Sequence, residues 1–359
     1  MAEHLTQNIY LRDVIARLEE NRIDYEILSL EGKAQIVVTQ YGGRGLGPFS
    51  EDGSSFSWLS HVFHDSNEFR KFIAARTWNL GGDRFWVAPE HPLFVKDRSA
   101  FNETYAVPAA LDPGNYRLSR HGNSARLEQT VHTALYQSLA DSVDFRIEWE
   151  ITPAKNPLIW IPEDKRPIVK FCGYEHTFTL EGLSGMDELN LEPWNLLQTH
   201  PGGKIIVPFT GAFSFVDYYE PVTGNLVVHD RFAELTVDGY TRYKAAFYAL
   251  NTLGRAAYIN RNKQGLYLIY KQYYNDVSNP YCSDPADRPG QSGCSLYVYN
   301  DNGSNGSYAE FENSGLTIGK GTGRVRTTTS VSHLFFAGDK PELEKLLWTL
   351  LSVRYDIQI

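Results

Sequence analysis

The sequence predicts an all-β protein built from large antiparallel sheets, with one helix near each end of the chain. Beyond residue 115, several long runs alternate polar and apolar residues, as strands with one buried face do. Turns rich in glycine and asparagine separate the runs, and apolar residues at helical spacing occur near both termini. The chain has no low-complexity linker and no repeat of fixed period, so we expect residues 1–359 to form a single domain.

Two segments carry the helical pattern. In residues 8–21 the apolar positions Leu11, Val14 and Leu18 recur at helical spacing, which predicts a helix within residues 1–24 that packs on the outside of the β body. Near the other end, Asp339 can cap a helix over residues 339–352 that tolerates Pro341 in its first turn. The apolar stripe of this second helix consists of Leu343, Leu346, Leu347, Leu350 and Leu351.

The strands are expected in the following order. Short strands (YEILSL, AQIVVTQY) begin at Tyr25 and lead through a glycine turn into a loop-rich stretch with Trp58. Long strands follow in NYRLSRHG, SARLEQTVHTALY, VDFRIEWEITPA and IVKFCGYEHTFTLEG. Further strands flank the Pro201-Gly202-Gly203 turn and fill the segment RYKAAFYALNTLGRAAYINRNKQGLYLIYKQYY.

Residues 295–319 combine two alternating runs with a turn cluster between them, which is typical of a hairpin or a long-looped strand pair. In the second run, Glu310 and Glu312 share one face and lie about 7 Å apart, because side chains alternate along a strand. Two interpretations stay open at this point. The carboxylates line a cleft, or they belong to a solvated outer face.

Composition excludes several function classes. The net charge is −9 and no window is rich in basic residues alone, so we expect no nucleic-acid partner. No apolar run approaches 18 residues, and the N-terminus lacks the basic head and apolar core of a secretory signal, which predicts a cytoplasmic protein with no membrane partner. Three cysteines without a CxxC pair and ten scattered histidines predict no disulfide framework, no metal and no cofactor.

Candidate binding residues are aromatic or charged side chains in dense or turn-rich segments. In WNLGGDRFWVAPEH, which Trp78 opens, Arg84 is expected in a loop beside a tryptophan, where it can hold a hydroxylated ring, or it can pair with Asp83 to tie that loop to a sheet edge. Trp194 is expected on a turn before the Pro-Gly-Gly sequence, where it can stack on a sugar or pack in the core. His200 and Asp301 lie in expected loops, where ligand contacts concentrate.

Several motifs occur in an order that resembles uncharacterised bacterial proteins of the galactose mutarotase-like group, of the DUF4380 and DUF6786 type. The resemblance covers roughly residues 25–355. Arg44, the arginine of the first motif, is a further candidate binding residue. The motifs are GGR (42–44), GGDRFW with APE (81–90), EPWNLLQTHPGGKIIVP (192–208), GRAAYI (254–259), GLYLIY (265–270), YND (299–301) and YAEFE (308–312).

The resemblance implies a β-supersandwich, in which two large twisted antiparallel sheets pack face to face, with a carbohydrate cleft on the concave side. Aldose 1-epimerases of this group use a late glutamate as base and histidines as acid. The late glutamate is matched by Glu310, or else by Glu312, and a mid-chain strand histidine by His176. The epimerase motif in which an Asn-His pair precedes Ser-Tyr-Phe-Asn is absent from this chain.

Three functions stay open. The first is binding of a mono- or oligosaccharide with aldose 1-epimerase-type isomerisation, in which Glu310 takes the proton of the anomeric hydroxyl and His176 protonates the ring oxygen. The second is sugar binding without catalysis. The third is a polysaccharide lyase acting on uronic-acid glycans, in which a tyrosine takes part in removing the C5 proton.

Overall fold

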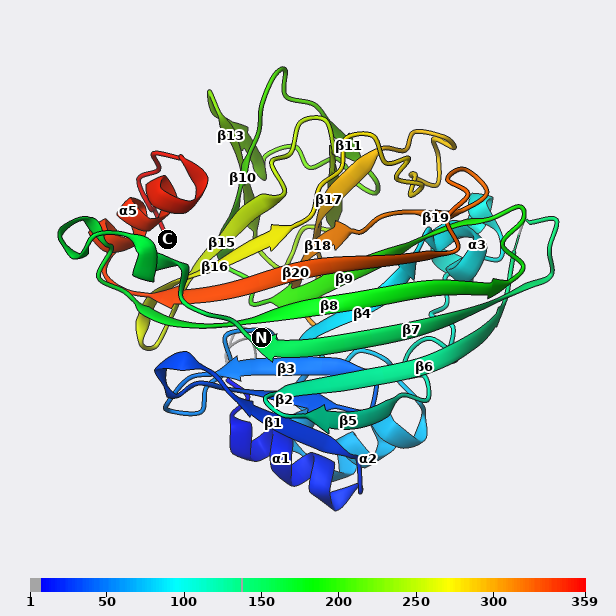
Figure 1. The fold of residues 1–359 in the computed structure, drawn as a ribbon, viewed down its shortest axis with the longest axis horizontal. Coiled ribbons are helices and arrows are strands. Elements are labelled where there is room, and N and C mark those ends of the chain that lie inside the picture. The colour runs from blue at the N-terminus through cyan, green and yellow to red at the C-terminus, as the bar shows by residue number, and fades with distance from the viewer. Residues whose placement is uncertain (1–7, 137) are drawn as a thin grey trace.

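The computed structural model describes residues 8–136 and 138–359 of the chain. It confirms the all-β prediction, because two large antiparallel sheets make up the body of the molecule (Figure 1).

The first sheet combines strands from the N-terminal, middle and C-terminal parts of the chain, and every neighbouring pair is antiparallel. Its order is β1 (Tyr25–Ser29), β2 (Gln35–Thr39), β3 (Arg44–Phe49), β4 (Asp83–Ala88), β9 (Asn190–Thr199), β18 (Ala309–Ser314), β17 (Cys294–Asn300), β14 (Tyr243–Tyr248) and β11 (Phe215–Asp217), with β19 (Ile318–Gly319) beside β9.

The second sheet holds the longest strands, and its neighbouring strands are also antiparallel. Its order is β12 (Leu226–Val228), β13 (Phe232–Val237), β10 (Gly203–Pro208), β15 (Arg255–Asn262), β16 (Gly265–Tyr273), β20 (Arg326–Ala337), β8 (Lys170–Ser184), β7 (Ser142–Pro153), β6 (Ser124–Ala134) and β5 (Arg117–His121).

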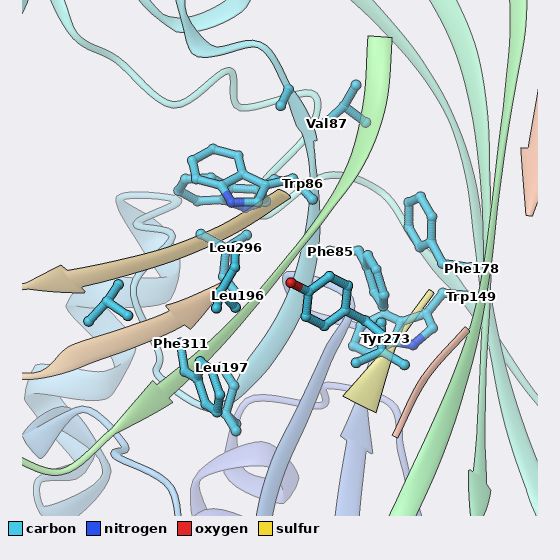
Figure 2. Packing of buried hydrophobic residues seen from close by; sticks show 14 of the residues in the cluster. Phe85, Trp86, Val87, Trp149, Phe178, Leu196, Leu197, Tyr273, Leu296 and Phe311 are labelled. Carbon is cyan, nitrogen blue, oxygen red and sulfur yellow. The ribbon is translucent and has the colours of Figure 1, made fainter. Parts of the chain in front are cut away.

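The inner faces of the two sheets meet in the main hydrophobic core. Phe85 of β4 stacks on Phe178 of β8 with ring centroids 4.2 Å apart, and it meets Trp149 of β7 edge-on at 5.4 Å. Figure 2 shows these three rings together, with Trp86 set apart from them. Because Phe85 and Trp86 are consecutive strand residues, one points into the core and the other to the outer face of the first sheet.

Helices cover parts of the outer faces. On the first sheet, α1 (Leu11–Glu20) buries Val14 and Leu18 next to α2 (Ser66–Ala74), at the edge formed by β1 to β3 (Figure 1). On the second sheet, α5 (Lys340–Leu351) buries Leu343 and Leu347. The predicted helix near each terminus is thereby confirmed. Two short helices, α3 (Glu90–Phe94) and α4 (Phe101–Thr104), follow β4.

Two local predictions differ from the structure. The stretch predicted to be loop-rich contains α2, whose N-cap residue Asp65 accepts hydrogen bonds from the backbone amides of Asn67 and Glu68. Asp339 occupies the N-cap of α5 as expected, but its side chain accepts no capping hydrogen bond from the described residues. Within the described ranges, no helix combines the length and apolar character needed to cross a membrane. The single domain stays a prediction.

Candidate functional site

A cavity of about 410 Å³ opens on the outer face of the first sheet, the face turned away from the second sheet. Side chains of β4, β9, β18, β17 and β14 form its floor, and the segments around α3 and α4, Tyr219 and residues 302–305 form its walls. Its volume is typical of a small-ligand site.

An ion pair between strands far apart in the sequence forms part of the floor. Nη2 of Arg84 is 2.7 Å from Oε1 of Glu310, and Nε2 of Gln198 donates to the same oxygen at 3.0 Å. The guanidinium carbon of Arg84 lies 4.2 Å from the ring centroid of Trp86 and 5.1 Å from that of Trp78. Two indoles and a carboxylate therefore hold Arg84 in one position.

A second ion pair lies beside the first. Nζ of Lys244 is 3.2 Å from Oε2 of Glu312, 3.6 Å from Oε2 of Glu90 and 4.3 Å from the ring centroid of Trp194. The indole Nε1 of Trp194 donates to Oε2 of Glu312 at 2.8 Å. The lysine and the indole thus converge on one buried carboxylate oxygen.

Burial and charge act together on these groups. Burial raises the pKa of Glu312 to about 7, although the neighbouring Lys244 opposes the rise. Burial alone would lower the pKa of Lys244, but the charges of Glu312, Glu90 and Glu310 outweigh it and raise that pKa. The pKa of Arg84 is likewise raised by Glu310 against the effect of burial. Both cations are therefore charged at neutral pH.

Asp301 organises the loop that overhangs the cavity. Its Oδ2 accepts hydrogen bonds from the backbone amides of Gly303, Asn305 and Ser307, and its Oδ1 accepts one from the hydroxyl of Tyr299. The Asp301 side chain is fully buried. It therefore shapes the loop and does not line the cavity, which corrects its predicted role as a ligand contact.

The structure brings several of the predicted residues together. Arg84, Trp78, Trp194 and Glu310 line the cavity, and Glu312 lies directly behind Lys244. Two details differ from the sequence interpretation. Arg84 and Trp194 lie within strands, not in a loop or turn. Asp83 does not pair with Arg84, because the two point to opposite faces of β4.

His176 is not part of this cavity, which corrects its assignment as the acid that works with Glu310. Its Nε2 lies 2.6 Å from Oδ2 of Asp83, on the inner face of β4, and the histidine is fully buried. Arg84, the next residue along β4, contacts Glu310 on the outer face. His176 and Glu310 are thus on opposite faces of the first sheet and cannot act on one ligand.

Arg44 and His200 also lie outside the cavity. Arg44 is fully buried, pairs with Asp112 at 2.6 Å and donates to the backbone carbonyls of Trp78 and Gly81, so it supports the segment that carries Trp78. His200 lines a separate cavity of about 590 Å³. Residues 301–307 lie between the two cavities, since Ser307 faces the second and residues 304 and 305 face the first.

The sequence interpretation missed other lining residues, among them Lys244, Trp86 and Tyr299. Strand alternation alone places Trp86 on the same face as Arg84, so that signal was present. Lys244 stands in the apolar run YKAAFY, and a lysine within a buried strand is itself a signal because charged residues are rarely buried without a partner. The remaining lining residues missed are Glu90, Phe101, Asn102, Tyr105, Tyr219, Arg242, Asn302, Ser304, Asn305 and Tyr308.

Between the sheets, Asp83, His176 and His333 place three potential metal-ligand atoms within 4.8 Å of one another. Their hydrogen bonds fit a network without a metal. Nε1 of Trp149 donates to Nδ1 of His176 at 2.8 Å, so the proton of His176 is on Nε2, which faces Asp83. A metal on Nε2 would require a proton on Nδ1, opposite the indole N–H. We interpret the cluster as a polar connection between the sheets.

Comparison with known proteins agrees with this architecture. A candidate aldose 1-epimerase from Escherichia coli K12 has a similar fold, with a TM-score of 0.51 at 10% sequence identity, over 87% of this chain and 99% of that one. A galactose mutarotase related enzyme from Lactobacillus acidophilus gives a TM-score of 0.47 at 8% identity, over 88% and 98% of the two chains. No curated protein matches the sequence.

The family profile described as a family of unknown function (DUF6786) matches residues 12–358, nearly the whole chain. The chain therefore belongs to this family, and its fold is the galactose mutarotase-like β-supersandwich.

Proposed function

We propose that the chain binds one neutral sugar ring in the cavity and interconverts its anomers, with Glu310 as the base. The observation that carries the proposal is that a carboxylate (Glu310), a guanidinium (Arg84) and an indole (Trp194) share one cavity. These are the groups that hold hydroxyls and stack on the C–H face of a pyranose. The description of the Escherichia coli protein as a candidate aldose 1-epimerase supports the choice of reaction.

The charges of the cavity favour a neutral ligand. Arg84 pairs with Glu310, Lys244 with Glu312 and Glu90, and Arg242 with Glu220 at 3.4 Å. Because each of these cations already has a carboxylate partner, a uronate would have to displace one of them to gain a salt bridge of its own. The arrangement therefore disfavours a lyase acting on uronic-acid glycans.

Glu310 is placed to accept a proton. Arg84 and Gln198 both donate hydrogen bonds to Oε1 of Glu310, while none of the described residues donates to Oε2. Oε2 is thus the oxygen that can take the proton of an anomeric hydroxyl. Removing that proton while the bond from C1 to the ring oxygen breaks gives the open-chain aldehyde, which recloses to either anomer.

The second candidate function is sugar binding without catalysis. It is favoured by one observation, that no histidine is found among the described residues lining the cavity. In that case Arg84 and Glu310 serve only as hydrogen-bond partners for hydroxyls.

One experiment tests both functions. Saturation-transfer NMR against D-glucose, D-galactose, D-mannose, D-xylose and L-arabinose reports binding, and anomer-exchange rates are read from the same samples. We expect binding with accelerated exchange, and Glu310→Gln should slow exchange by about 10²–10⁴-fold. Glu148→Gln on the second sheet is the matched control and should leave exchange unchanged, because Glu148 pairs with Arg126 on another surface. Binding without accelerated exchange would select the non-catalytic function, and absence of binding would refute both.

A further inference from the structure

Lys244 and Glu310 stand in one line across the floor of the cavity. In the strand register Lys244 pairs with Tyr299, and Tyr299 pairs with Glu310. Residues directly opposite in antiparallel strands point to the same face, so all three side chains rise into the cavity. The backbones of β14 and β18 are two strand spacings apart, about 10 Å. Both side chains are long enough to reach a ring lying between them.

We infer that Lys244 donates the proton to the ring oxygen during anomer exchange and so fills the role that the sequence assigned to His176. This inference rests on the proposed function, because it names the acid that a Glu310 base requires.

The other lining groups are less suited to this step. The guanidiniums of Arg84 and Arg242 do not release protons in proteins. The hydroxyl of Tyr299 is already donated to Asp301 at 3.0 Å. Among the remaining phenols, Tyr105 already donates its hydroxyl to Oε1 of Glu90 at 3.1 Å. Burial raises the pKa of Tyr219 and of Tyr308 well above the usual value for a phenol, so both hold their protons.

Donation from Lys244 leaves the net charge of the floor unchanged, because Glu310 changes from anion to neutral acid as Lys244 changes from cation to neutral amine. Glu312 and Glu90 lose their cation during that interval, which favours the return of the proton to Lys244 when the ring closes. Glu312 and Trp194 fix the ammonium group in place, at 3.2 Å and 4.3 Å. We assign Glu312 as a positioning residue, because it acts through Lys244 and does not line the cavity.

The step balances in atoms and electrons. Glu310 Oε2 takes the proton of O1, the O1–C1 bond becomes a carbonyl, and the bond from C1 to the ring oxygen breaks with its electron pair going to that oxygen. The ring oxygen takes a proton from Nζ of Lys244. After rotation about the bond between C1 and C2, the neutral Lys244 takes the proton back as the oxygen attacks the other face of C1, and Glu310 returns its proton to O1.

The test is Lys244→Arg, assayed with the sugar of the panel that wild type exchanges fastest. Arginine keeps the positive charge and can pair with Glu312, but it cannot release a proton. We expect exchange to fall by about 10²–10⁴-fold, while binding detected by NMR persists, because the positive charge beside Glu312 is kept. The matched control is Lys204→Arg, because Lys204 pairs with Glu234 on the second sheet. Exchange in the control should equal that of wild type.

A second variant keeps the inference testable if Lys244→Arg does not fold. Lys244→Ala, prepared with ethylammonium present so that Glu312 and Glu90 keep a cation, leaves room at the position of the ammonium group. Exchange should then rise with the concentration of ethylammonium, which it would not do for a purely structural lysine. Wild-type-like exchange in Lys244→Arg, or no rescue of Lys244→Ala, would overturn the role of Lys244 while the proposed function stands. Binding without any exchange in wild type would overturn the catalytic proposal itself, and this inference with it.

Discussion

Replacing Arg84 by Met should destabilise the protein more strongly than replacing any surface arginine. The side chains of Arg84 and Glu310 are only 1% and 8% exposed, so the variant leaves a buried carboxylate without its cation. Breaking a buried pair in this way costs about 3–5 kcal/mol. Gln198 still donates to Glu310, which keeps the expected loss within that range. The double variant with Glu310→Gln should recover part of the loss, because no unpaired charge then remains.

The assay is urea unfolding at pH 7 followed by tryptophan fluorescence. Arg126→Met is the matched control, because Arg126 is 35% exposed and pairs with Glu148 at 3.2 Å on the surface. It should change the free energy of unfolding by less than about 1 kcal/mol. Equal losses in Arg84→Met and Arg126→Met would refute the reasoning, and so would a double variant that loses the sum of the two single losses.

Three further predictions concern the stacking platform, the loop and the buried lysine. Trp194→Phe should weaken sugar binding in NMR titrations by about 0.5–1.5 kcal/mol, because it removes part of the aromatic face and the hydrogen bond to Glu312. An unchanged affinity would contradict the stacking role of Trp194. Asp301→Ala leaves three backbone amides without their acceptor, which costs about 1–3 kcal/mol for each amide that stays buried. Residues 302–307 should therefore become sensitive to limited proteolysis. Equal cleavage of the wild type would contradict this. Burial lowers the pKa of Lys271 from 10.5 to about 7. Between about pH 7 and pH 10.5 the unfolded chain then binds more protons than the folded chain, so stability should rise with pH across this window. Lys271→Met should flatten this rise in urea midpoints while Lys204→Met keeps it, and an equal slope in both variants would contradict the assignment.

Much of the architecture could be predicted because it follows from local patterns. Alternation marks strands with one buried face, and the spacing of Val14 and Leu18, or of Leu343 and Leu347, marks helices that pack on a β body. The helix α2 was not predicted, although Phe69, Phe72 and Ile73 recur at helical spacing and pack on the body, so the signal was present. It spans only nine residues, too few for the pattern to repeat.

The site could be predicted only in part, because sequence does not tell which face of which sheet a strand residue occupies. Arg84 and Glu310 are 226 residues apart and meet through strand order, which no local pattern encodes. In sequence, His176 looks like a catalytic histidine, since it stands within a mid-chain strand. In the structure that strand belongs to the second sheet, and the side chain of His176 points into the core. Lys244 was not predicted as a site residue because most other residues of its strand, YKAAFY, are apolar.

The most direct test of a sugar site on the first sheet is a crystal structure of the chain soaked with the sugar that binds best by NMR. We expect a sugar ring in the cavity beside Trp194, with hydroxyls within hydrogen-bond distance of Arg84 and Glu310. A ring found instead in the cavity lined by His200, with only water beside Glu310, would contradict the account.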